Sequence, residues 1–134
     1  MRRLVLISIV FIMNFLHFSI GQSLINQNTV LPDGEFENIA VKKIAGDSLA
    51  SNFIIWVKDT VKTHKHEHHS ETIYVIEGSA KMYMNDSLYH IKNDDVIFIP
   101  KNTWHAVKVT SPNALKVLSV QSPGFFGKDR IFKD

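Results

Sequence analysis

The chain has 134 residues, no cysteine, and 15 basic against 13 acidic side chains. That length suits a single domain, and the lack of cysteine excludes disulfides, so stability must come from a packed core. Two of the 15 basic residues, Arg2 and Arg3, lie in a predicted leader, which leaves 13 basic and 13 acidic side chains in the mature chain. Such a neutral surface argues against nucleic acid or anionic lipid as a partner.

Residues 1–21 have the features of a secretory signal peptide. A pair of arginines precedes an almost wholly apolar run, and Ser19 and Gly21 match the small-x-small pattern before a cleavage site. We therefore expect cleavage after Gly21 and export, in the unfolded state, to the periplasm or the extracellular space. The alternative is an uncleaved membrane anchor, which the short run and its interruption by Asn14 and His17 disfavour.

The mature chain reads as short strands separated by turn residues. A polar stretch over residues 22–37 is interpreted as a tether or an edge strand, and no window beyond the leader has helical periodicity. About eight short strands at this spacing predict an all-β sandwich or barrel over residues 38–134. The predicted strands are residues 38–46, 52–58, 72–78, 80–84, 87–92, 95–100, 104–109 and 115–121.

Side chains alternate along a strand, so each lysine that points to solvent assigns an inner face. With Lys108 outward, His105 is predicted to face the interior beside Val107 and Val109. With Lys81 outward, Met82 faces inward between Ala80 and Met84. With Lys116 outward, the predicted inner residues of the last strand are Leu115, Val117, Ser119 and Gln121.

Residues 64–69 contain four histidines, followed closely by a carboxylate. His64 and His66 alternate on one predicted strand, so both rings can reach one ion from the same face. Glu71 lies seven positions after His64, so on a continuous strand its side chain would point to the opposite face. A turn between them is therefore needed to direct its carboxylate toward the two imidazoles. The inward-facing His105 is the natural candidate for a fourth ligand. Several imidazoles with one carboxylate suit a divalent transition metal.

Other interpretations of the histidine cluster remain open at this point. A register that uses His66 and His68 leaves only two residues before Glu71, and parity alone does not exclude it. In the preferred register, His68 and His69 occupy the turn. The cluster as a whole could also be a solvated loop that binds metal adventitiously. His90 lies on a predicted surface hairpin and is expected to be exposed.

Two segments of the chain resemble the conserved motifs of the cupins. The first cupin motif is H-x-H, three or four residues, E, six residues, G, and "HKHEHHSETIYVIEG" fits it with His64, His66, Glu71 and Gly78. The second motif is G-x5-P-x-G-x2-H-x3-N, and "DDVIFIPKNTWHAV" matches its proline and histidine with Pro100 and His105. This spacing favours His64 and His66 over the alternative register.

Three positions depart from the second cupin motif. Asp94 and Asn102 stand where the family usually has glycine, and Val109 stands where it often has asparagine. Asparagine adopts the left-handed conformation of a turn at modest cost, so Asn102 is compatible with the fold. None of the departures affects a predicted ligand.

The resemblance implies a jelly roll, also called a double-stranded β-helix barrel, with one divalent transition metal near its mouth. The implied ligands are His64, His66, Glu71 and His105, and the ion could be Zn, Cu, Mn, Fe or Ni. The expected function is that of an enzyme acting on a small oxygen-rich molecule, of dioxygenase or isomerase type. The alternative is a non-catalytic extracytoplasmic module that binds a metal or a small ligand.

Partner contacts are expected inside and outside the barrel. Ser119 and Gln121 are candidates to orient a small-molecule substrate, although they could instead hydrogen-bond each other or a buried water. The outward-facing Tyr83, Trp104 and Lys81 suggest a homodimer formed through the outer face of their sheet. No membrane partner is expected after cleavage of the leader.

Overall fold

A computed structural model describes residues 23–133. The predicted signal peptide, residues 1–21, lies outside the described residues. The described chain forms ten strands and one short 3-10 turn, η1 (Gln27–Thr29), and none of its helices is long and apolar enough to cross a membrane. The strands are β1 (Ile39–Gly46), β2 (Ser51–Val57), β3 (Thr60–His66), β4 (Ser70–Glu77), β5 (Ser79–Met84), β6 (Ser87–Lys92), β7 (Val96–Ile99), β8 (His105–Val109), β9 (Leu115–Ser122) and β10 (Arg130–Phe132).

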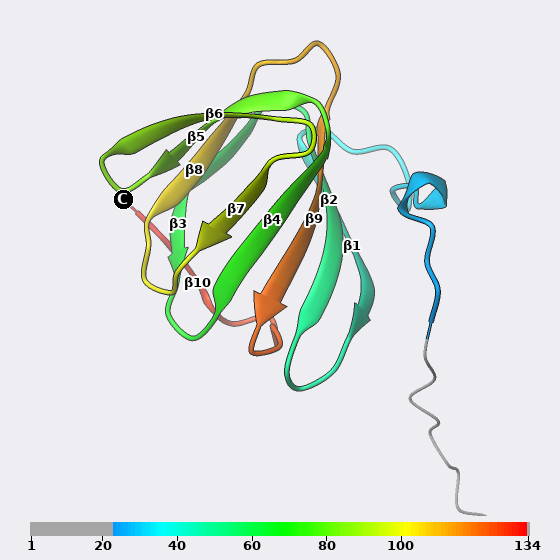
Figure 1. The fold of residues 1–134 in the computed structure, drawn as a ribbon, viewed down its shortest axis with the longest axis horizontal. Helices are drawn as coiled ribbons and strands as arrows, with labels where there is room; N and C mark the ends of the chain where they lie inside the picture. Colours follow the sequence, from blue (N-terminus) through cyan, green and yellow to red (C-terminus); the bar gives the residue numbers. More distant parts are fainter. Residues whose placement is uncertain (1–22, 134) are drawn as a thin grey trace, which may run out of the picture.

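The strands form two five-stranded antiparallel sheets that face each other (Figure 1). One sheet has the order β1-β2-β9-β4-β7, and the other has the order β10-β3-β8-β5-β6. Consecutive strands such as β3 and β4 lie in different sheets, so the chain crosses repeatedly between them. The predicted all-β jelly roll is confirmed.

All eight predicted strands are present, as is the strand expected to carry His64 and His66, and one further strand, β10, completes the fold. The structure extends the histidine segment backward into β3, whose polar sequence "TVKTHKH" lacks the apolar alternation of a typical strand. The strand β10 was not predicted. It has three exposed residues and is held by antiparallel pairing with β3, a partner far away in sequence. A segment of this kind carries no local signal of its own.

The core fills the space between the two sheets. It is made of apolar side chains from both, and Val75, Met82 and Ile99 are among the most deeply buried. The predicted inner faces of β5, β8 and β9 are confirmed, because Ala80, Val107 and the whole predicted inner set of β9 are buried. Met84 and Val109, toward the strand ends, are partly buried.

The prediction that Lys116 points into solvent was wrong, since its side chain is only 8% exposed. Its ammonium group donates to the carbonyl oxygens of Gln27, at 2.8 Å, and Val30, at 3.4 Å. It also lies 5.7 Å from the centre of the Trp56 ring. The N-terminal segment thus covers this outward-facing residue and supplies backbone acceptors for its charge.

Two of the motif departures adopt the backbone conformation that glycine would provide. Asp94 has a φ of 72° and Asn102 has a φ of 64°, both in the left-handed region. Asp94 also accepts a hydrogen bond of 2.6 Å from the Tyr74 hydroxyl. At Gly78, with a φ of 90°, a Cβ would come within 2.9 Å of the Ser111 hydroxyl oxygen, so this position needs glycine.

We expect Met82→Ala to lower the free energy of unfolding by about 2–5 kcal/mol, because Met82 is fully buried and its loss leaves a cavity. Tyr83→Ala, one position along β5 on the exposed face, is the matched control and should cost less than about 1 kcal/mol. Chemical denaturation of both variants measures the difference. Equal losses would contradict the assignment of faces.

Candidate metal centre

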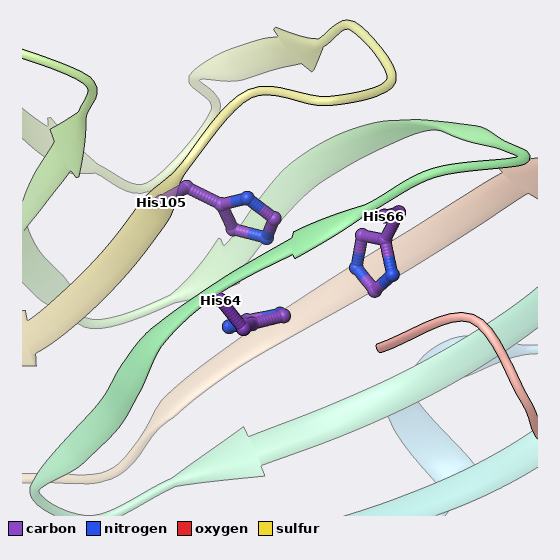
Figure 2. Close-up of side chains that lie close together, drawn as sticks. All are labelled: His64, His66 and His105. Atoms are coloured by element: carbon purple, nitrogen blue, oxygen red, sulfur yellow. The ribbon is translucent and has the colours of Figure 1, made fainter. Parts of the chain in front are cut away.

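Three buried imidazoles converge at one end of the barrel (Figure 2). His64 lies directly opposite His105 in the antiparallel pairing of β3 with β8, and His66 follows two positions along on the same face. The ring centres are 4.2 Å apart for His64 and His105, 5.0 Å for His64 and His66, and 5.3 Å for His66 and His105. Each ring offers one nitrogen atom within 4.8 Å of the others. This spacing suits ligands of a single ion.

The carboxylate of Glu71 reaches the same point from the facing sheet. Its Oε2 atom lies 3.7 Å from Nε2 of His66 and 3.6 Å from Nε2 of His105. The turn over residues 67–69 separates β3 from β4, as the parity of the sequence required. All four residues predicted as metal ligands are therefore brought together, and each is at most 5% exposed.

Backbone carbonyl groups orient the three imidazoles. The Nδ1 atom of His64 lies 2.8 Å from the carbonyl oxygen of Lys62, and that of His105 lies 2.9 Å from the carbonyl oxygen of Thr103. The Nδ1 atom of His66 lies 3.2 Å from the carbonyl oxygen of Asp129. Since a carbonyl only accepts, each Nδ1 carries a proton, and in the neutral form of each ring Nε2 then has a free lone pair.

The free ring nitrogens lack partners within the described chain. Nε2 of His66 and Nε2 of His105 are buried and have no hydrogen-bond partner among residues 23–133. A buried polar atom without a partner costs free energy, and a pair of them aimed at one point requires an explanation. A divalent metal ion bound there would satisfy both, so the donor set fits a metal of the imidazole-binding class.

Burial also sets the charge of the site. It lowers the pKa of His64 from 6.5 to about 3, with help from the charges of His105, Arg130 and His66 and against the hydrogen bond to Lys62. Burial alone would raise the pKa of Glu71, but the imidazoles of His105 and His66 and the hydroxyl of Ser119 outweigh it and hold that pKa well below its usual range. At neutral pH His64 is thus neutral and Glu71 is ionised, the forms that bind metal.

Ser119 and Gln121 face the site but turn toward Glu71. The Ser119 hydroxyl donates to Oε1 of Glu71, and the Gln121 amide nitrogen lies 3.4 Å from the same oxygen. The two side chains also contact each other at 3.3 Å. They therefore fix the orientation of the carboxylate, which leaves Oε2 directed at the imidazoles.

The structure reveals an aspartate that the sequence did not single out. Asp129, just before β10, accepts backbone N–H groups of Glu67, His68 and His69 with its carboxylate, and its Oδ2 atom lies 2.6 Å from Nδ1 of His69. Its carbonyl oxygen also orients His66. A lone aspartate near the end of the chain has no local pattern, so its role follows only from the fold.

The two remaining histidines of the cluster differ from each other. His68 is exposed in the turn, whereas His69 is buried with its ring centre 4.1 Å from that of His66. His69 thus packs behind a metal-ligand candidate and is held there by Asp129. His90 is exposed, as predicted.

The fold and the sequence together define a cupin. The sequence matches the Cupin domain family over residues 52–121, which is more than half of the chain. The chain therefore belongs to the cupin family, as the two motifs suggested.

Similarity to individual proteins extends over different parts of the chain. An uncharacterized protein from Aquifex aeolicus is 30% identical over 99 residues, which cover 74% of this chain and 81% of that protein. The quercetin 2,3-dioxygenase of Bacillus subtilis is 32% identical over 68 residues, which cover 51% of this chain and 20% of that enzyme. An uncharacterized conserved protein with a double-stranded β-helix domain from Klebsiella pneumoniae has the same fold, with a TM-score of 0.72 and 17% identity over 84% of this chain and 99% of that one.

The stability of the chelator-treated protein should fall as the pH is lowered through the range from about 6.5 toward 3. The unfolded chain protonates His64 near its ordinary pKa of 6.5, while the folded chain resists protonation down to about 3. Each pH unit in this range removes at most about 1.4 kcal/mol through this residue.

Thermal denaturation between about pH 7.5 and about pH 5 measures this loss. Because Glu71 also has a lowered pKa, it weakens the fold further at still lower pH. A His64→Gln variant should show a shallower decline over the upper part of the range. A slope identical to that of the unsubstituted protein would contradict the burial of a neutral His64.

Proposed function

We propose that this protein is a single-domain, metal-dependent cupin that binds one divalent transition metal through His64, His66, Glu71 and His105. The observation that carries the proposal is the pair of buried, unpartnered Nε2 atoms of His66 and His105, aimed with Glu71 at one point. The Nδ1–carbonyl contacts support it, because they hold the rings in the metal-binding tautomer.

The proposed activity is that of a dioxygenase or isomerase acting on a small molecule. A divalent ion at this site, when bound, would supply Lewis-acid polarisation of a substrate oxygen or a binding place for dioxygen. The chain's own residues orient the ligands and keep the site dry. Ser119 and Gln121 hold the carboxylate of Glu71 in place, and the two sheets exclude water around the imidazoles. The partial likeness to quercetin 2,3-dioxygenase supports a dioxygenase but covers only a fifth of that enzyme.

The second candidate function is a non-catalytic module that binds a metal or a small ligand. The size of the interior cavity favours it, because about 60 Å³ accommodates only a few water-sized groups. Turnover of a substrate that disappears in a folded His105→Ala variant would establish an enzyme. Retention of a co-purified ligand without turnover would favour the binding module.

The predicted export and dimerisation are part of the same proposal. In an exported, unfolded chain, zinc and copper would compete well for the site by the Irving–Williams order. For the dimer, the outer face of β3, β8 and β5 has an open hollow of about 760 Å³ next to Tyr83 and Trp104. Light scattering and N-terminal sequencing of protein recovered from the export compartment test these points: a monomer contradicts the dimer, and a retained leader contradicts cleavage.

His105→Ala should lose bound metal, with an affinity lower by more than about 100-fold, because it removes a ligand rather than a group that only orients one. Metal analysis of the purified protein and competition with a chelator of known affinity measure the change. His90→Ala removes an exposed histidine and is the matched control, which should leave the affinity unchanged. Full metal retention by the His105 variant would refute the proposed centre.

A further inference from the structure

The C-terminal strand brings a guanidinium group to the inner face of the barrel. In the pairing of β10 with β3, Arg130 lies opposite His66 and Phe132 lies opposite His64. Opposite residues of an antiparallel pair share a face, and the Phe132 ring centre is indeed 5.9 Å from that of His64. Arg130, two positions from Phe132, therefore points to the same side as the imidazoles.

Arg130 lines one cavity together with His64, Glu71 and His105. It is solvent-exposed, and no carboxylate of residues 23–133 lies within 4.0 Å of its guanidinium nitrogens. The nearest acidic residue in sequence, Asp129, is engaged by His69 and by three backbone N–H groups. Arg130 thus brings a charge to the mouth of the site without a partner from the described chain.

The rest of the cavity wall is apolar. Side chains from both sheets form it, among them Val61, Ile73, Met82, Val107 and Leu115. The volume is about 60 Å³, and since a water-sized group needs about 10–15 Å³, the enclosed part holds about four to six such groups. An apolar wall with a few polar groups favours a ligand that has one charged end and a short hydrocarbon body.

We propose that Arg130 is a specificity-determining residue that binds a carboxylate, and that the substrate or ligand is a small carboxylic acid with an apolar body. A planar guanidinium pairs with a carboxylate through two parallel hydrogen bonds. A single guanidinium group suits a singly charged carboxylate better than a phosphate dianion, which attracts several donors. This inference rests on the proposed function and replaces the expected oxygen-rich substrate by a more apolar one.

The test compares matched charged and neutral probes. Butyrate and butyramide differ only in their polar end, and titration calorimetry on the zinc-loaded protein measures the preference between them. Because a carboxylate can also coordinate zinc, the contribution of Arg130 is the part of that preference that Arg130→Gln loses. We expect butyrate to bind at least about tenfold more tightly than butyramide, and Arg130→Gln to lower butyrate affinity at least about tenfold while leaving butyramide affinity unchanged. Lys133→Gln is the control, because it removes a nearby positive charge whose ammonium group lies 5.9 Å from the Trp104 ring on the outer face. It should keep the preference.

The outcomes separate this inference from the proposed function. If neither the unsubstituted protein nor Arg130→Gln holds zinc, the proposed metal centre fails, and the same titration on the metal-free protein still tests Arg130. Arg130→Lys keeps the positive charge but loses the two parallel hydrogen bonds of the guanidinium, and it should bind butyrate with intermediate affinity. This variant replaces Arg130→Gln in the test if the glutamine variant is unstable. Equal affinity for butyrate and butyramide, or full butyrate affinity in Arg130→Gln, overturns the inference.

Discussion

The structure depends on burying three imidazoles and one carboxylate at one end of the interior, next to a large apolar core. Three imidazoles and a carboxylate in this position would be costly if their polar atoms had no partners. The fold offsets most of this cost, because each Nδ1 faces a carbonyl group and Oε1 of Glu71 accepts from Ser119. The Nε2 atoms of His66 and His105 remain without a hydrogen-bond partner in the described chain, and these are the atoms that would coordinate a bound metal ion.

Both ends of the described chain help to hold this arrangement. The N-terminal segment supplies carbonyl groups to Lys116 on the outer face of β9, the strand that carries Ser119 and Gln121. At the other end, Asp129 holds the turn that separates His66 from Glu71. The terminal segments thus contact both the turn before Glu71 and the strand that carries the residues orienting it. The site is therefore a property of the whole domain.

The chemistry of the cavity narrows what the protein can bind. Three of the four metal-ligand candidates (His64, Glu71 and His105), the apolar wall and Arg130 line one small cavity. A metal ion bound at the site would coordinate oxygen atoms, the apolar wall would pack against hydrocarbon, and the guanidinium group would bind an anion. Together these three preferences point to a small carboxylate as the ligand. The cupin fold by itself would not indicate a ligand class, since that fold supports many activities.

The sequence alone determined the all-β class, most strand positions and the four residues that converge, because alternation and motif spacing are local properties of the chain. It also predicted the turn before Glu71 from parity. Lys116 was misassigned because the N-terminal segment that covers it is distant in sequence. Only the tertiary structure could decide that Ser119 and Gln121 orient Glu71, that Asp129 holds the histidine turn, and that Arg130 lines the cavity. Each of these follows from pairing between distant strands, β10 with β3 and β9 with β4, and such long-range contacts leave no periodic signal in the residues that make them.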